Sequence, residues 1–205
     1  MSNTMSAPIH VAIFASGTGS NARKLIEYFS HREDVKICLI VSNKKDAPVL
    51  QLAAAYHIPT QVIHRTYFYD TENLLEVLRS YGVSFIVLAG FLWKIPAYLV
   101  AAFDHKMVNI HPALLPAYGG QGMYGMHVHQ AVWQAKEGWS GITIHFVNAH
   151  YDEGDIIFQA RCVLAPGDTP SDIAHKVQAL EHQYFPGVVD ALLTGAPLPK
   201  PSMIY

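Results

Sequence analysis

Short apolar runs alternate along the first half of the chain with segments in which apolar residues recur every three or four positions. The runs are rich in Val and Ile, and almost every position in them is apolar. This is typical of strands whose two faces are both covered, because neither face of such a strand needs polar side chains. Strands are therefore predicted at residues 9–16, 35–42, 83–90 and 106–110.

The segments between these runs have helical spacing. The first predicted helix begins near Ser20 and places Leu25 and Phe29 on one face, and two further helices are predicted over 47–56 and 71–81. Strands that alternate with helices in this way predict a parallel sheet with right-handed crossover connections.

The pattern changes after residue 115. A helix is predicted over 127–136, and two β segments follow at 141–149 and 154–166. The connection between these segments is too short for a crossover helix, so they are predicted to add an antiparallel pair to the sheet.

A long helix closes the sequence, and its ends are marked by capping residues. Thr169 is predicted to be the N-cap, with Pro170 at the first position and Asp172 in the first turn, and Gly195 ends the helix. The complete pattern predicts an α/β fold with a Rossmann-like, mostly parallel, twisted sheet flanked by helices. No linker or repeat divides the chain, so we expect a flexible tail over 1–8 and a single domain over 9–205.

Composition limits the classes of function. The chain is 51% hydrophobic and 15% charged, and its net charge is −2. These proportions are typical of a globular protein. The chain has no block of Lys and Arg residues, so it lacks the charge pattern of a protein that binds nucleic acid or a membrane surface. It has no apolar stretch of membrane-spanning length and no signal-peptide core, so we expect a cytoplasmic protein.

The two cysteines, Cys38 and Cys162, lie in apolar runs. They are predicted to be buried, reduced thiols.

The sequence SGTGSN follows the first predicted strand and opens the first predicted helix. Gly17 and Gly19 permit a tight turn and close approach of a ligand, and Ser20 and Asn21 add side-chain donors at the helix N-terminus, where an anion is favoured. The third glycine of the dinucleotide fingerprint is absent, because that position is Ala22. The loop indicates a monophosphate site, although a tight turn alone remains an alternative.

The sequence VNIHPALLP places Asn109 and His111 at the end of a predicted strand, where parallel sheets bind ligands. An amide can donate to a developing oxyanion, and an imidazole can donate to it or carry a proton. Asp152 lies in the loop between the last two β segments and could orient the imidazole and raise its pKa. Without a Ser or Cys nucleophile, these residues favour group transfer in which the substrate attacks. Considered singly, each is more commonly a turn or hydrogen-bonding residue.

The 12 histidines offer an alternative, a zinc site. His127 and His129 lie two apart in the sequence MHVHQ, and His111, His145 and His150 could join them. The chain has no His-Glu-x-x-His sequence and no cysteine pair at ligand spacing, so we disfavour this alternative and expect no metal.

Four segments together resemble the folate-dependent formyltransferases, and the resemblance extends from about Val11 to Leu193. They are SGTGSN at 16–21, LAGFLWKI at 88–95, NIHPALLP at 109–116 and GITIHFVNAHYDEGDII at 141–157. The last two form a specific pair of motifs. Their presence implies the formyltransferase fold.

The resemblance implies an activity and a catalytic trio. The amine of glycinamide ribonucleotide would attack the formyl carbon of 10-formyltetrahydrofolate, a step of de novo purine biosynthesis. Asn109 and protonated His111 would stabilise the tetrahedral oxyanion. Asp152 would sustain the charge on His111 and help to relay a proton through water from the attacking amine to the leaving nitrogen.

The resemblance also implies binding residues. The N-terminal half would bind the ribonucleotide, with Gly19, Ser20 and Asn21 on the phosphate and with Gln178 and Glu181, from the last helix, near the glycinamide end. The C-terminal half would bind the folate, largely through backbone groups. The residues expected at the folate are Phe91, Leu92, Trp93, Lys94, Ile95, His145, Val147, Asn148 and Tyr151. Small molecules are thus the expected partners, and a homodimer is left open.

Some positions depart from the family pattern. Phe91, Leu92 and Trp93 stand where the family often has Phe-Met-Arg, and the glycine-rich segment 118–127 is longer than usual. Arg65 lies near the region of a substrate-binding arginine but does not align with it cleanly. The resemblance also implies a cis peptide bond before Pro116, which follows the strand with the catalytic pair.

Other functions remain open from the sequence alone. Formyltetrahydrofolate hydrolase and methionyl-tRNA formyltransferase use the same catalytic trio, but we expect neither the regulatory domain of the first nor the nucleic-acid-binding domain of the second. A non-catalytic, phosphate-binding Rossmann-like module would need the glycine loop but not Asn109, His111 and Asp152 together.

Overall fold

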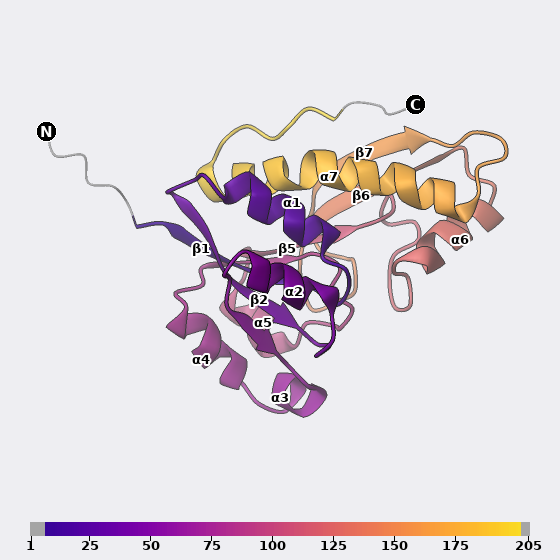
Figure 1. The fold of residues 1–205 in the computed structure, drawn as a ribbon. Helices are drawn as coiled ribbons and strands as arrows, with labels where there is room; N and C mark the ends of the chain where they lie inside the picture. Colours follow the sequence, from indigo (N-terminus) through magenta and orange to yellow (C-terminus); the bar gives the residue numbers. More distant parts are fainter. Residues whose placement is uncertain (1–6, 202–205) are drawn as a thin grey trace, which may run out of the picture.

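The computed structural model describes residues 7–201, which form one sheet with helices on both faces (Figure 1). The order of the seven strands is β3-β2-β1-β4-β5-β6-β7. Strands β1 to β5 are mutually parallel, and β6 and β7 are antiparallel to their neighbours, as the sequence predicts. The strands are β1 (Ile9–Phe14), β2 (Val35–Ser42), β3 (Thr60–Val62), β4 (Phe85–Leu88), β5 (Met107–His111), β6 (Trp139–Phe146) and β7 (Ile156–Val163).

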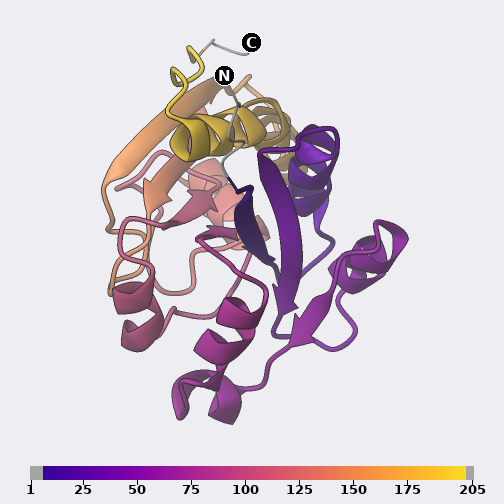
Figure 2. The same ribbon diagram turned by 90° about the vertical axis from the view of Figure 1, so that its left-hand side faces the viewer.

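Two layers of helices enclose the sheet. Helices α1, α2, α6 and α7 pack on one face and α3, α4 and α5 on the other, with the twisted sheet between them (Figure 2). The helices are α1 (Ser20–Phe29), α2 (Pro48–Ala55), α3 (Arg65–Tyr69), α4 (Asn73–Ser80), α5 (Ala97–Ala102), α6 (Met126–Gln134) and α7 (Pro170–Thr194).

The central strand β1 shows why its sequence is almost continuously apolar. Val11 and Ile13 pack in the core beneath α1 and α7, whereas Ala12 and Phe14 pack in the core on the opposite face. All four are fully buried. Because successive side chains of a strand point to opposite faces, a sheet covered on both sides needs apolar residues at every position.

The longest helix begins and ends as predicted. Thr169 and Asp172 form a reciprocal capping box, in which each side chain accepts from the other residue's backbone N–H. Gly195 ends the helix in the left-handed conformation, with a φ of 74°. Glycine commonly ends a helix in this way, because it adopts the left-handed conformation without steric cost. Helix α7 packs against both α1 and α6, so it links the predicted phosphate loop to the second half of the chain.

Three short elements were not predicted. Strand β3 has three residues at the sheet edge, and none of them is buried, so the sequence contains no apolar run there. Helices α3 and α5 have five and six residues, too few for a recognisable helical period. Most of the predicted tail, residues 1–6, lies outside the described residues.

The cysteines are free thiols. Both Cys38 and Cys162 are buried, as predicted. Among residues 7–201, no helix combines the length and apolar character needed to cross a membrane.

Candidate active site

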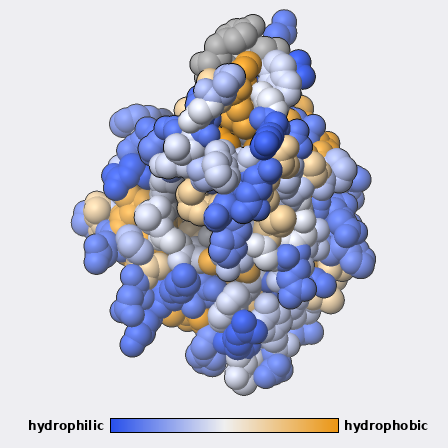
Figure 3. All heavy atoms as spheres, turned by 90° about the vertical axis from the view of Figure 1, so that its right-hand side faces the viewer, coloured by the Kyte–Doolittle hydropathy of each residue, from blue (hydrophilic) through white to orange (hydrophobic). Residues whose placement is uncertain are grey.

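A cavity of about 820 Å³ lies at the carboxyl ends of the parallel strands. Its wall is formed by the loops that follow β1, β4 and β5, by the glycine-rich segment 118–127 and by one face of α7. This is the place at which open α/β sheets bind ligands. The face drawn in Figure 3 is mostly hydrophilic, with hydrophobic residues in small separate areas. A cavity of this size is suited to a small molecule.

The glycine loop after β1 forms one end of the cavity. Gly19 is the N-cap of α1 in the left-handed conformation, with a φ of 77°, and a Cβ atom there would lie 2.6 Å from Cγ2 of Val49. No side chain caps the helix, so its first backbone N–H groups stay available to an anion. Ser20 and Asn21 line the cavity beside it.

Helix α7 brings its predicted residues to this loop. Asn21 Nδ2 donates to Glu181 Oε2 at 2.9 Å, and Gln178 Nε2 donates to Ser20 Oγ at 3.5 Å. Burial raises the pKa of Glu181, and the hydrogen bond from Asn21 opposes that rise only in part. All five residues predicted for the ribonucleotide therefore lie together in one wall of the cavity.

The three residues predicted to be catalytic meet elsewhere in the same cavity. His111 Nδ1 lies 3.5 Å from Asp152 Oδ2, and Asn109 Nδ2 donates to Asp152 Oδ1 at 3.4 Å. Antiparallel pairing of β5 with β6 places His145 opposite Asn109, and Asn109 Nδ2 lies 3.1 Å from His145 Nε2. The two strands and the loop after β6 thus hold the amide, both imidazoles and the carboxylate in one group.

The segment after β5 folds back over this group. His111 Nε2 donates to the Tyr118 carbonyl at 2.7 Å, and the Gly120 N–H donates to Asp152 Oδ2 at 2.9 Å. The Leu115–Pro116 bond is cis, as the resemblance implies. Buried Thr143 supports the turn, because it donates to the Ala113 carbonyl and accepts from the Leu115 N–H.

Burial and the nearby carboxylate act in opposite directions on the pKa of His111. Desolvation lowers the pKa of His111, and the opposing effects of Asp152 and the Tyr118 carbonyl do not overcome it. The effect of Asp152 on the pKa of His111 has the predicted upward direction, but burial outweighs it, because His111 is only 3% exposed. Burial would also raise the pKa of Asp152, but the His145 and His111 imidazoles and the Gly120 N–H hold it below its ordinary value.

The nine residues predicted for the folate are divided by the structure. Phe91, Leu92 and Tyr151 line the cavity, and His145 lies behind it against Asn109. The other five do not line it: Ile95 is buried in the core beside Val147, Asn148 accepts from the His150 N–H, and Trp93 and Lys94 lie in an aromatic cluster.

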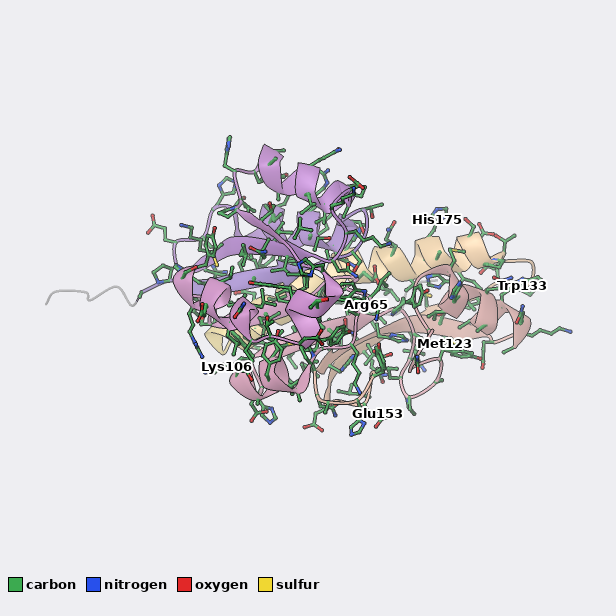
Figure 4. The ribbon with its side chains drawn as sticks, turned by 90° about the horizontal axis from the view of Figure 1, so that it is seen from below. Arg65, Lys106, Met123, Trp133, Glu153 and His175 are labelled. Carbon is green, nitrogen blue, oxygen red and sulfur yellow. The ribbon has the colours of Figure 1, made fainter. Side chains whose placement is uncertain are left out.

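This aromatic cluster occupies the region in which the sequence departs from the family pattern. The Trp93 ring contacts Phe68 and Tyr69, and the Arg65 guanidinium lies 5.4 Å from its centroid. Lys94 Nζ lies 5.9 Å from the Tyr151 ring. Figure 4 shows Arg65 on α3, whereas Met123 belongs to the glycine-rich loop that lines the cavity.

Among the cavity residues that were not predicted as part of the site, two have basic side chains, Lys44 and His129. Lys44 follows β2 in the polar sequence SNKKD, which does not single it out, whereas His129 belongs to the noticed sequence MHVHQ. His127 is exposed and lies 3.3 Å from the Gly122 carbonyl. Within the described part of the chain, no three His, Cys, Asp or Glu side chains are grouped so that they could hold a metal ion.

Comparisons with known proteins agree with this geometry. The model of the formyl transferase family matches residues 9–189. The chloroplastic phosphoribosylglycinamide formyltransferase of Arabidopsis thaliana is 43% identical over 188 residues, which are 89% of this chain and 64% of that relative. The chain thus spans less than two thirds of the plant relative.

Shorter relatives are matched over most of their length. The phosphoribosylglycinamide formyltransferase of Bacillus subtilis is 34% identical, with 89% of this chain and 93% of that protein covered. The crystal structure of the enzyme of that name from Anaplasma phagocytophilum has a TM-score of 0.82 and 34% identity, with 90% of this chain and 86% of that chain covered.

Proposed function

Because the chain belongs to the formyl transferase family, we propose that it transfers the formyl group of 10-formyltetrahydrofolate to the amine of N1-(5-phosphoribosyl)glycinamide. The reaction is a step of de novo purine biosynthesis. The proposal depends above all on one observation, the grouping of Asn109, His111 and Asp152 in a cavity that extends to the glycine loop. A module that only bound phosphate would have no need of this group.

The amine of the ribonucleotide is the nucleophile, and it attacks the formyl carbon. The formyl oxygen becomes negatively charged in the tetrahedral intermediate, and the Asn109 amide donates a hydrogen bond to it. Donors fixed in place before the reaction stabilise such charge most effectively. The contact of Asn109 Nδ2 with His145 Nε2 supplies this fixed orientation, and the N–H that reaches Asp152 at 3.4 Å would turn to the oxyanion.

His111 Nδ1 lies 3.5 Å from Asp152 Oδ2, and this position suits the imidazole to carry a proton during the reaction. His111 accepts the proton that the amine loses as its bond to carbon forms. The resulting imidazolium is stabilised by Asp152 and lies next to the oxyanion. The proton then passes to the folate nitrogen as its bond to the formyl carbon breaks, so one C–N bond replaces another without net loss of a proton.

The two substrates occupy different parts of the site. The α1 N-terminus, Ser20 and Asn21 hold the phosphate, and Gln178 and Glu181 hold the rest of the ribonucleotide. The folate lies against Phe91, Leu92 and Tyr151. No metal takes part in this scheme.

A direct assay tests the proposal. The purified protein is mixed with glycinamide ribonucleotide and 10-formyltetrahydrofolate in the presence of a chelator, and deformylation of the folate is followed by absorbance. Turnover that requires the ribonucleotide and survives chelation is the expected result. Deformylation without the ribonucleotide would instead identify a hydrolase, and no deformylation under either condition would refute the proposal.

A further inference from the structure

One buried polar group in the cavity wall has no part in the scheme above. His129 lies near the start of α6 and is only 6% exposed, yet it lines the cavity. Within residues 7–201, its Nδ1 atom has no hydrogen-bond partner. A buried polar atom without a partner costs free energy, so its retention in a cavity wall indicates that a bound molecule supplies the partner.

The surroundings of His129 indicate the chemistry of that partner. Burial and the nearby His111 imidazole lower the pKa of His129 to about 4, so the ring is neutral at pH 7. A neutral imidazole has one nitrogen that donates and one that accepts. The Asn21 Oδ1 atom, in the same cavity, is also buried and has no partner among the described residues. Together with the Glu181 carboxyl group, this wall is rich in acceptors.

We propose that His129 is a further substrate-binding residue, whose Nδ1 atom accepts a hydrogen bond from an N–H or O–H group of the ribonucleotide. The inference rests on the proposed function, because that function places the ribonucleotide in this cavity. Three kinds of group in that molecule have the required chemistry, namely the attacking amine, the amide N–H and the ribose hydroxyls. His129 and His111 line the same cavity, which favours the amine.

The chain offers a matched control on the neighbouring helix. His182 in α7 also has a buried ring nitrogen, Nε2, without a partner among the described residues, but His182 does not line the cavity. If an unpartnered imidazole were a general feature of the packing, the two residues would behave alike. If His129 binds substrate, only its replacement affects the ribonucleotide.

The test measures the Kd of the ribonucleotide by calorimetry for the wild type and three variants. His129→Leu removes the nitrogen, His129→Asn keeps a polar atom near the position of Nδ1, and His182→Leu is the control. We expect Kd to rise about five- to tenfold in His129→Leu, the equivalent of one lost hydrogen bond, with most of the affinity restored in His129→Asn and none lost in His182→Leu. The Kd of the folate should stay unchanged in all three.

The remaining outcomes separate the two proposals. Wild-type affinity in His129→Leu, or an equal loss in His129→Leu and His182→Leu, would overturn the role of His129. Failure of the wild type itself to bind the ribonucleotide would overturn the proposed function instead. Analogues that lack the amine, the amide N–H or one of the ribose hydroxyls then identify the donor, because the penalty of His129→Leu disappears only for the analogue that lacks it.

Discussion

Asp152 Oδ2 lies 3.5 Å from His111 Nδ1, and the same oxygen accepts the Gly120 N–H from the loop that follows His111. The carboxylate therefore contacts both the imidazole and the segment that covers it. The backbone of Asp152 has a φ of 55°. This is a left-handed conformation that Asp and Asn tolerate better than other side chains. The fold thus fixes the position of Asp152, and its carboxylate lies where it can stabilise a positive charge on His111.

Replacement of Asp152 by Asn should separate binding from chemistry. Asn has nearly the same shape and tolerates the left-handed conformation, so the Kd of both substrates should change little. The imidazolium formed at His111 would lose its counter-charge, and kcat should fall about 10²- to 10⁴-fold. Stopped-flow single turnovers would measure the chemical step. Turnover at the wild-type rate would remove Asp152 from the mechanism.

The phosphate loop can be tested at a single glycine. Gly19→Ala places a Cβ atom 2.6 Å from Cγ2 of Val49 and forces a non-glycine residue to a φ of 77°. The left-handed conformation alone costs about 1–2 kcal/mol. We expect a lower free energy of unfolding in urea and a higher Kd of the ribonucleotide.

Gly17→Ala is the matched control for this loop. A Cβ atom at Gly17 meets nothing within 4 Å, and Gly17 is not among the residues with positive φ. Its unfolding free energy should stay within about 0.5 kcal/mol of the wild type. Equal effects of the two substitutions would contradict the close approach at Gly19 as the cause.

The sequence predicted the parallel sheet because the strand pattern is local. An apolar residue at every position of β1 is visible without knowing what covers it. The glycine loop and the Asn109–His111 pair were also local, since each follows a recognisable strand. The segments β3, α3 and α5 are too short for a periodic signal, and tertiary contacts decide their conformation.

The approach of Asp152 to His111 depends on distant parts of the chain. It requires β6 to pair with β5, and no spacing in the sequence specifies that pairing. The pKa of His111 depends also on how deeply the returning segment buries it, and the sequence indicates the carboxylate but not this burial. His129 was noticed as a possible ligand, but the direction in which its ring points depends on how α6 packs against α7.

Thr143 gives a test of the support beneath the catalytic strand. It is fully buried, donates to the Ala113 carbonyl and accepts from the Leu115 N–H and Gln159 Nε2. Thr143→Val keeps the shape but leaves these groups unpaired, which should lower the unfolding free energy by about 1–3 kcal/mol. Because the supported segment follows His111, kcat should fall as well. Thr143→Ser retains the hydroxyl and should recover most of both losses.

The buried histidines predict how stability depends on pH. The pKa of His129 is about 4 in the folded protein, against an ordinary value of 6.5, and burial lowers the pKa of His111 in the same direction. Between these values the unfolded chain binds protons that the folded protein does not. The contribution of these histidines to the free energy of unfolding is therefore fully present above pH 6.5, and it is lost as the pH falls toward 4. His129 contributes on the order of 3 kcal/mol at most to this change in the free energy of unfolding.

Urea unfolding at intervals from about pH 4.5 to 7.5 measures this slope. His129→Asn cannot titrate in this range, so its unfolding free energy should depend on pH less steeply than that of the wild type. His175, which is exposed and points outward from α7 (Figure 4), provides the control, and His175→Asn should keep the wild-type slope. A wild-type slope in His129→Asn would mean that His129 takes up its proton without cost in the folded protein, and that its burial does not keep it neutral.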